Sequence, residues 1–215
     1  MEEIFISIAS YRDPELFNTI ENCIEQAKEP DRLKFCICWQ YEDKDYDNQL
    51  LNKLKEKQYK NITILKLPYK QSQGVCWVRS LIQDKYDNEP YILQLDAHHR
   101  FIKNWDALCI REIKSLQKAG HEKPILTAYL PSYEPDNDPK ARINIPWELK
   151  FDRFLPQGPA MPQPESIDDH KKLKKPVRAR LYSAHFIFTI GQYYKEVLYD
   201  PDLYFHGEEV SLAIR

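Results

Sequence analysis

Three side chains that could do chemistry, Asp96, His98 and His99, directly follow a short apolar run over residues 91–95. The run is too short and too rich in β-forming residues for a helix. It also comes after Asn88-Glu89-Pro90, which ends the preceding element, so we predict a buried strand. Asp96 would lie at the carboxyl end of this strand, where open α/β sheets bind their ligands.

The spacing of these residues indicates which side chains act together. In an extended chain alternate side chains share a face, so Asp96 and His98 should converge while Ala97 and His99 point away. One carboxylate and one imidazole suit a divalent metal of intermediate character such as Mn²⁺. The competing interpretation is an aspartate that caps a turn, followed by two half-exposed histidines, and spacing alone does not decide between the two.

Composition excludes several classes of function. The chain has 215 residues, with 31 Lys and Arg against 33 Asp and Glu and a formal net charge of −2. We therefore expect neither a nucleic acid nor an anionic membrane as partner. No apolar run approaches the roughly 18 residues of a membrane span, and the acidic start Met1-Glu2-Glu3 does not resemble a signal peptide, so we expect a cytoplasmic protein without a membrane span. The five scattered cysteines are best explained as reduced core thiols.

The elements that must position the cluster alternate along the first hundred residues. Strand-like apolar runs cover residues 4–9, 33–39, 62–67 and 91–95, and helical spacing covers residues 14–24, 48–59 and 75–82. Asp13 is placed to cap the first helix, with Pro14 in its first turn. This alternation predicts a parallel sheet with helices on both faces.

The second half of the chain is less regular. We predict a helix over 105–118, strands over 125–129 and 181–190, and a short helix over 193–197. Residues 131–176 are rich in Pro and charge and are expected to form a lid or a partly disordered insert. Residues 210–215 look like the first turns of a helix that stops without a cap, so we expect part of the native domain to lie beyond Arg215.

Four segments, in order, resemble one family. They are Ser7-Ile8-Ala9-Ser10-Tyr11-Arg12-Asp13-Pro14-Glu15-Leu16, Gly74-Val75-Cys76-Trp77-Val78-Arg79-Ser80, Gln94-Leu95-Asp96-Ala97-His98-His99-Arg100-Phe101 and His206-Gly207-Glu208-Glu209. Together they look like the marker segments of the GlcNAc-transferases that modify protein hydroxyls, glycosyltransferase family sixty and its bacterial and viral relatives. The match spans nearly the whole chain.

The resemblance implies a GT-A type α/β fold over residues 1–215, with a mostly parallel central sheet flanked by helices. It also implies a UDP-sugar donor, most often UDP-GlcNAc, and Mn²⁺ or Mg²⁺ that bridges the diphosphate to an Asp-x-His variant of the Asp-x-Asp motif. The expected activity is transfer of the sugar to an acceptor hydroxyl on a protein or a glycan. Family members usually carry Met after the motif His, and we expect His99 not to disturb Asp96 and His98, because it should fall on the other face.

The resemblance also gives roles to donor-binding residues. Asp96 and His98 would be metal ligands, and Arg79 would reach the phosphates or the uridine carbonyls by bidentate bonds. Ser10, Tyr11 and Arg12 would hold uracil beside the first strand. The alternatives are a surface role for Arg79, loop packing by Tyr11, and an ion pair of Arg12 with its neighbour Asp13.

Two further assignments concern the last segment. Glu208 and Glu209 would supply a catalytic base or a positioning carboxylate, although only one can face the pocket and both could simply cap a helix. The third metal ligand would be His206 or a residue after Arg215, whereas His185 fits a core histidine better. The alternatives to a transferase are an inactive GT-A domain that binds a sugar nucleotide or a partner protein, and a nucleotidyltransferase, which would need a Gly-rich phosphate loop that the sequence lacks.

Overall fold

A six-stranded sheet forms the centre of the molecule in a computed structural model that describes residues 2–42 and 45–215. The strand order is β3-β2-β1-β4-β8-β5. Neighbouring strands are parallel from β3 to β4, and β8 is antiparallel to both β4 and β5. The strands are β1 (Ile4–Tyr11), β2 (Leu33–Tyr41), β3 (Ile62–Pro68), β4 (Tyr91–Asp96), β5 (Ile125–Thr127) and β8 (Phe186–Ile190).

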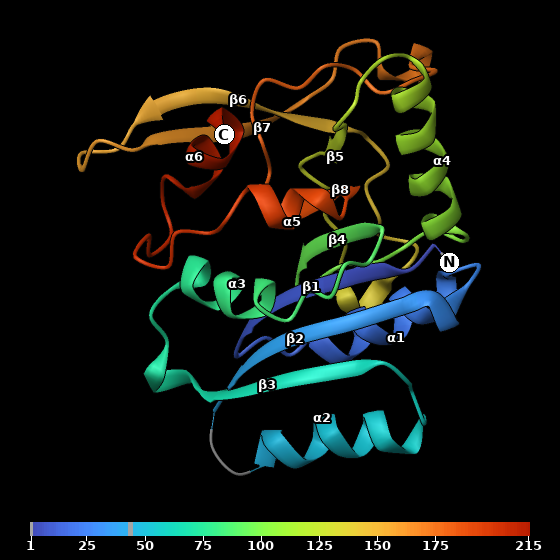
Figure 1. Ribbon diagram of the computed structural model, residues 1–215, viewed down its shortest axis with the longest axis vertical. Helices are drawn as coiled ribbons and strands as arrows, with labels where there is room; N and C mark the ends of the chain where they lie inside the picture. Colours follow the sequence, from blue (N-terminus) through green and yellow to red (C-terminus); the bar gives the residue numbers. More distant parts are fainter. Residues whose placement is uncertain (1, 43–44) are drawn as a thin grey trace.

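Helices cover both faces of this sheet (Figure 1). One apolar core packs under α1 (Leu16–Gln26), α2 (Asp45–Glu56) and α4 (Trp105–Lys118), and the other under α3 (Val75–Gln83), α5 (Gln192–Glu196) and α6 (Glu208–Ile214). The alternation of β1 explains the division, because Ile4, Ile6 and Ile8 point into the first core and Phe5 into the second. The predicted mostly parallel sheet with helices on both faces is confirmed.

The turn after β1 differs from the prediction. Helix α1 begins at Leu16, and its N-cap position is Glu15, without a side-chain cap hydrogen bond. Asp13 is therefore not the cap. Its Oδ1 instead accepts the backbone N–H of Glu15 at 2.9 Å, which closes a tight turn two residues on, as aspartate side chains commonly do.

The excursion over residues 131–176 contains more regular structure than its composition indicates. Strands β6 (Trp147–Phe154) and β7 (Ala160–Ser166) pair as an antiparallel hairpin of their own. The hairpin is difficult to predict from the sequence because β7 contains Pro162 and Pro164, and proline is rare in strands. The register shift between Phe151 and Arg153 also disrupts the strand pattern. Part of the excursion is thus an ordered hairpin, and the expectation of a lid or a partly disordered insert over 131–176 stays a prediction.

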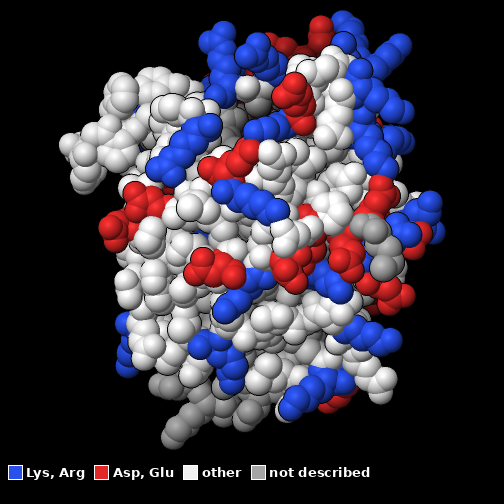
Figure 2. Space-filling model, in the orientation of Figure 1, with Lys and Arg blue, Asp and Glu red and all other residues white. Residues whose placement is uncertain are grey.

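Charge is unevenly distributed over the surface. Lys and Arg side chains gather around the α4 end of the molecule in Figure 2. They include Arg111, Lys114 and Lys118 on α4, and residues 171–180, which contribute six further Lys and Arg side chains, are all exposed. The net charge of −2 therefore does not describe this face.

Two further expectations from the sequence concern the cysteines and the lengths of the helices. The five cysteines are unpaired, and four of them, Cys23, Cys36, Cys38 and Cys76, are buried, which confirms core thiols. In the described part of the chain, no helix combines the length and the apolar character needed to cross a membrane.

Candidate functional site

The order in which successive strands are added to the sheet reverses at β1. From β1 the connection leads to β2 on one side, whereas β3 is followed by β4 on the other side of β1. The carboxyl ends of β1 and β4 are adjacent, with Ala9 in register with Asp96. Such switch points are where open α/β sheets bind ligands. The predicted position of Asp96 at the carboxyl end of a strand is confirmed.

Asp96 is held from one side by a buried arginine. Arg79 Nη2 donates to Asp96 Oδ1 at 3.0 Å, and Arg79 Nη1 donates to a carboxylate oxygen of Glu208. The Arg79 and Glu208 side chains are 4% and 5% exposed, whereas the Asp96 side chain is 31% exposed. Burial lowers the pKa of Arg79, but Glu208 and Asp96 more than offset it, so that the pKa lies well above its ordinary value. The guanidinium is a fixed cation.

Close packing between two distant segments makes this arrangement possible. Val75 N–H donates to the carbonyl of Tyr204 at 3.0 Å at the start of α3. Gly74 has φ +107°, and a Cβ at this position would lie 2.4 Å from the Tyr204 carbonyl oxygen. Only glycine fits such a backbone approach. The contact brings the N-terminal end of α3 against the loop before α6, and so Arg79 against Glu208.

His98 is oriented by Asp13, across the crevice between β1 and β4. His98 Nδ1 lies 2.7 Å from Asp13 Oδ2, and the His98 side chain is 57% exposed. This hydrogen bond raises the pKa of His98. Burial raises the pKa of Asp13, but the hydrogen bonds with His98 and the Glu15 N–H and the charges of the two nearby imidazoles together lower it by more. A carboxylate that is hydrogen-bonded to one imidazole nitrogen fixes the orientation of the ring and leaves the other nitrogen free to bind a ligand.

His99 does not face away from His98, contrary to the expectation. Strand β4 ends at Asp96, so the alternation of a strand does not continue to residues 98 and 99. The His98 and His99 rings stack with centroids 6.0 Å apart, and His99 stacks in turn on His185 at 5.7 Å. Burial lowers the pKa of His99 to about 3 and that of His185 to about 4, so both rings are neutral.

His185 is a satisfied histidine, as expected. Its Nε2 accepts the Leu130 N–H at 2.9 Å, and its Nδ1 lies 2.9 Å from Ser183 Oγ. Neither nitrogen is free to bind a metal ion.

The residues predicted to hold uracil lie at the end of β1. Ser10 is buried, whereas the Tyr11 side chain is exposed and meets the ring of Tyr69 edge to face. Arg12 pairs with Glu42, not with Asp13, and its guanidinium lies 4.8 Å from the centre of the Tyr69 ring. Tyr69 was not predicted. The only signal for it in the sequence is its place directly after β3.

Both glutamates of the last segment have partners within the protein. Glu208 is engaged by Arg79, and Glu209 Oε1 accepts the Ala184 N–H at 2.9 Å. Burial raises the pKa of Glu209. Neither glutamate lines the pocket described next, so their catalytic assignment stays a prediction. His206 is exposed and packs edge-on against Phe205. Within the described residues, no three His, Cys, Asp or Glu side chains come together as a possible metal site.

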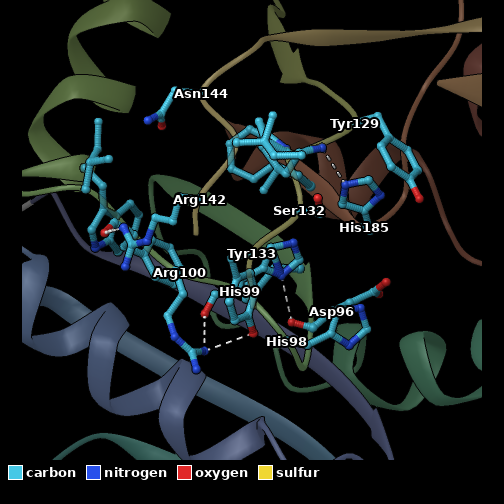
Figure 3. A pocket seen from close by; sticks show the side chains of 18 of the residues that line it. Asp96, His98, His99, Arg100, Tyr129, Ser132, Tyr133, Arg142, Asn144 and His185 are labelled. Carbon is cyan, nitrogen blue, oxygen red and sulfur yellow. Dashed lines mark hydrogen bonds between the residues drawn. The ribbon is translucent and has the colours of Figure 1, made fainter. Parts of the chain in front are cut away.

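A pocket of about 560 Å³ opens beside Asp96 and His98. Figure 3 shows these two side chains on one side of it and Arg142 and Asn144 on the other. Its walls come from the loop after β4, the first half of α4, residues 129–133 and 142–144, and the start of β8. The excursion after residue 131 therefore forms part of the site's wall.

Comparison with known families identifies the chain. A family model described as "Glycosyltransferase (GlcNAc)" matches residues 3–60 and 44–215. The chain belongs to this GlcNAc glycosyltransferase family. The resemblance carried by the four marker segments is thereby confirmed. A search of curated proteins gives no match.

Solved structures show the fold of this chain. GalNAc-T7, solved with UDP, GalNAc and Mn²⁺, is similar over 99% of this chain and 40% of its own, with 15% identity and a TM-score of 0.69. This likeness confirms the GT-A type fold. Staphylococcus aureus TarS 1–349, solved with UDP-GlcNAc, matches 64% of this chain and 37% of its own, with 13% identity and a TM-score of 0.49, too low to carry an argument. The chain thus spans well under half the length of either protein.

Proposed function

We propose that this protein is a metal-dependent glycosyltransferase that moves GlcNAc from a UDP-sugar donor to an acceptor hydroxyl on a protein or a glycan. One observation carries the proposal. In the described structure Asp96 Oδ2 and His98 Nε2 have no hydrogen-bond partner, although the other polar atom of each side chain is held, by Arg79 and by Asp13. Two preoriented donor atoms, one oxygen and one imidazole nitrogen, therefore stand free at the switch point of the sheet.

These two atoms fit Mn²⁺ or Mg²⁺. Carboxylate oxygen suits both ions and imidazole nitrogen favours Mn²⁺, and Mn²⁺ is present in the GalNAc-T7 structure. A bound ion would neutralise charge on the diphosphate as the sugar leaves. Asp96 and His98 would hold it, Asp13 would keep the His98 ring in place, and Arg79 would keep the Asp96 carboxylate in place. The assignment of His206 as a third ligand stays a prediction.

The same crevice offers surfaces for the rest of the donor. Tyr11, exposed at the end of β1, and Tyr69 beside it present aromatic rings against which uracil can stack. Arg12 next to them carries a partly exposed guanidinium, whereas Arg79 is buried in its ion pairs. We therefore assign to Arg79 the positioning of Asp96, and not direct contact with the phosphates.

The transfer is a substitution at the anomeric carbon of the donor sugar. The acceptor oxygen forms a bond to this carbon, the bond from the carbon to the UDP phosphate oxygen breaks, and UDP leaves with the bonding electrons. The hydroxyl proton passes to a base; of the two predicted carboxylates, Glu208 is engaged by Arg79 and Glu209 by the Ala184 N–H, so the assignment of the base stays a prediction.

Thermal unfolding with UDP and Mn²⁺ tests the proposal. A ligand at 100 times its Kd adds about 2.7 kcal/mol to the free energy of unfolding, which raises Tm by about 5–11 °C for a chain of this size. Asp96→Asn keeps an oxygen for Arg79 but weakens the metal ligand, so the shift with UDP and Mn²⁺ should be lost. Asp84→Asn, an exposed change at the end of α3, is the control and should keep it. An equal shift in wild type and Asp96→Asn would contradict the metal site.

A further inference from the structure

The pocket beside Asp96 and His98 has a part that the donor site does not use. Beyond the two metal-ligand candidates, it runs past His99 towards α4 and residues 142–144. Its volume of about 560 Å³ lies within the range of pockets that bind small molecules.

The charges around this part of the pocket cancel one another. Arg100 pairs with Glu15 and, at 3.6 Å, with Asp138, and it also lies over the Tyr133 ring. Arg142 forms two hydrogen bonds with the Asp138 carboxylate. Both guanidinium groups are thus neutralised by carboxylates, and among the described residues no lysine lines the pocket. A phosphate or carboxylate ligand would therefore find no unpaired Lys or Arg among the described residues of this wall.

The remaining walls are largely apolar. Phe101, Ile102 and Ile143 contribute side chains at the opening, and Trp105 and Leu108 contribute them from α4. Ile102 is 64% exposed and Ile143 is 39% exposed. An apolar group that entered the pocket would remove this surface from water, which is favourable.

His99, which lines this space, carries an acceptor atom that no described residue uses. His99 is 6% exposed, and its Nδ1 lies 3.1 Å from the carbonyl oxygen of Asp96. A carbonyl can only accept, so Nδ1 carries the hydrogen and Nε2 carries a free lone pair. No described residue donates a hydrogen bond to Nε2. Nε2 is also not one of the fully buried side-chain nitrogen and oxygen atoms that lack a hydrogen-bond partner. Nε2 is therefore accessible from the pocket. A buried acceptor of this kind gains most from a ligand that donates a hydrogen bond.

We propose that this pocket binds the acceptor, and that it takes an uncharged, apolar group next to the acceptor hydroxyl, with a hydroxyl or amide N–H of the acceptor donating to His99 Nε2. The inference rests on the proposed function, because it places the acceptor next to the donor at Asp96. An apolar side chain in a peptide and an aliphatic alcohol share this chemistry. A charged peptide does not.

Calorimetric titration of the protein with UDP and Mn²⁺ present tests the proposal. The probes are short serine peptides that differ only in the residue beside serine, which is leucine, phenylalanine, aspartate or lysine, together with a medium-chain alkyl alcohol. We expect the leucine and phenylalanine peptides to bind about tenfold more tightly than the charged ones, the size of effect of an apolar group in a matching pocket. Tight binding of the alcohol alone would identify the aliphatic source of the same chemistry.

Two variants locate the site. Ile102→Asp puts a charge on an exposed side chain at the pocket opening, and should weaken binding of the apolar probes about tenfold. Leu198→Asp changes a side chain of similar exposure, 58%, that does not line the pocket, and should leave this binding unchanged. His99→Leu removes Nε2 and should weaken binding of hydroxyl probes while the Tm shift with UDP and Mn²⁺ reports that the donor site is intact.

The outcomes separate the two proposals. A normal Tm shift with UDP and Mn²⁺, combined with equal binding of apolar and charged peptides, would overturn the acceptor pocket and leave the proposed function standing. Equal effects of Ile102→Asp and Leu198→Asp would overturn it as well. Absence of the Tm shift in the wild type would overturn both.

Discussion

Replacement of Arg79 by methionine should destabilise the protein more than any exposed charge change. Arg79 and Glu208 form an ion pair with side chains only 4% and 5% exposed. Methionine fills much of the space but leaves Glu208 buried without its counter-charge. Removal of one partner of a buried pair costs about 3–5 kcal/mol, which corresponds to a fall in Tm of roughly 6–20 °C at about 2–4 °C per kcal/mol.

Urea unfolding followed by circular dichroism measures this loss. Lys123→Met is the matched control, because Lys123 pairs with Glu196 at 2.7 Å but both side chains are exposed. Exposed pairs contribute about 0–1 kcal/mol, so this variant should unfold near the wild-type midpoint. The double variant Arg79→Met/Glu208→Leu should recover most of the lost stability, because it removes both charges. If Arg79→Met stays within about 1 kcal/mol of wild type, the pair is not buried in solution and the reasoning fails.

Two other predictions concern the histidine cluster. His99 and His185 have pKa values lowered to about 3 and about 4. The unfolded chain takes up their protons below about pH 6.5 and the folded chain does not, so the free energy of unfolding should fall by about 2 kcal/mol per histidine between pH 8 and pH 5. His185→Gln should remove about half of this dependence, and an unchanged dependence would argue against a neutral His185. The exposed His98, with a raised pKa, works weakly in the opposite direction. Asp13→Ala should weaken Mn²⁺ binding in the presence of UDP about 10–100-fold, because loss of a carboxylate that orients a metal-binding histidine has an effect of this size. Electron paramagnetic resonance of free Mn²⁺ measures this binding. Mn²⁺ binding as tight as in wild type would show that Asp13 does not orient the ligand.

The local pattern of the sequence determined the main elements and one end of the site. The alternation of apolar runs with helical spacing predicts the first four strands and the parallel part of the sheet, because burial of an apolar face is a local property of each segment. The position of Asp96 follows in the same way, since β4 must end where its apolar run ends. The hairpin β6–β7 was not predicted, because its prolines and its register shift remove the alternation of apolar and polar residues on which strand prediction depends.

Tertiary packing alone decided which polar side chains meet. Arg79 and Glu208 are 129 positions apart, and Asp13 and His98 are 85 positions apart. The approach of the Gly74 and Tyr204 backbones brings the first pair together, and the adjacency of β1 and β4 brings the second together. A sequence shows that each residue can donate or accept, but the partner depends on which elements pack side by side. For the same reason the sequence gives Asp96 and His98 as ligands, while their orientation by Arg79 and Asp13 exists only in the folded chain.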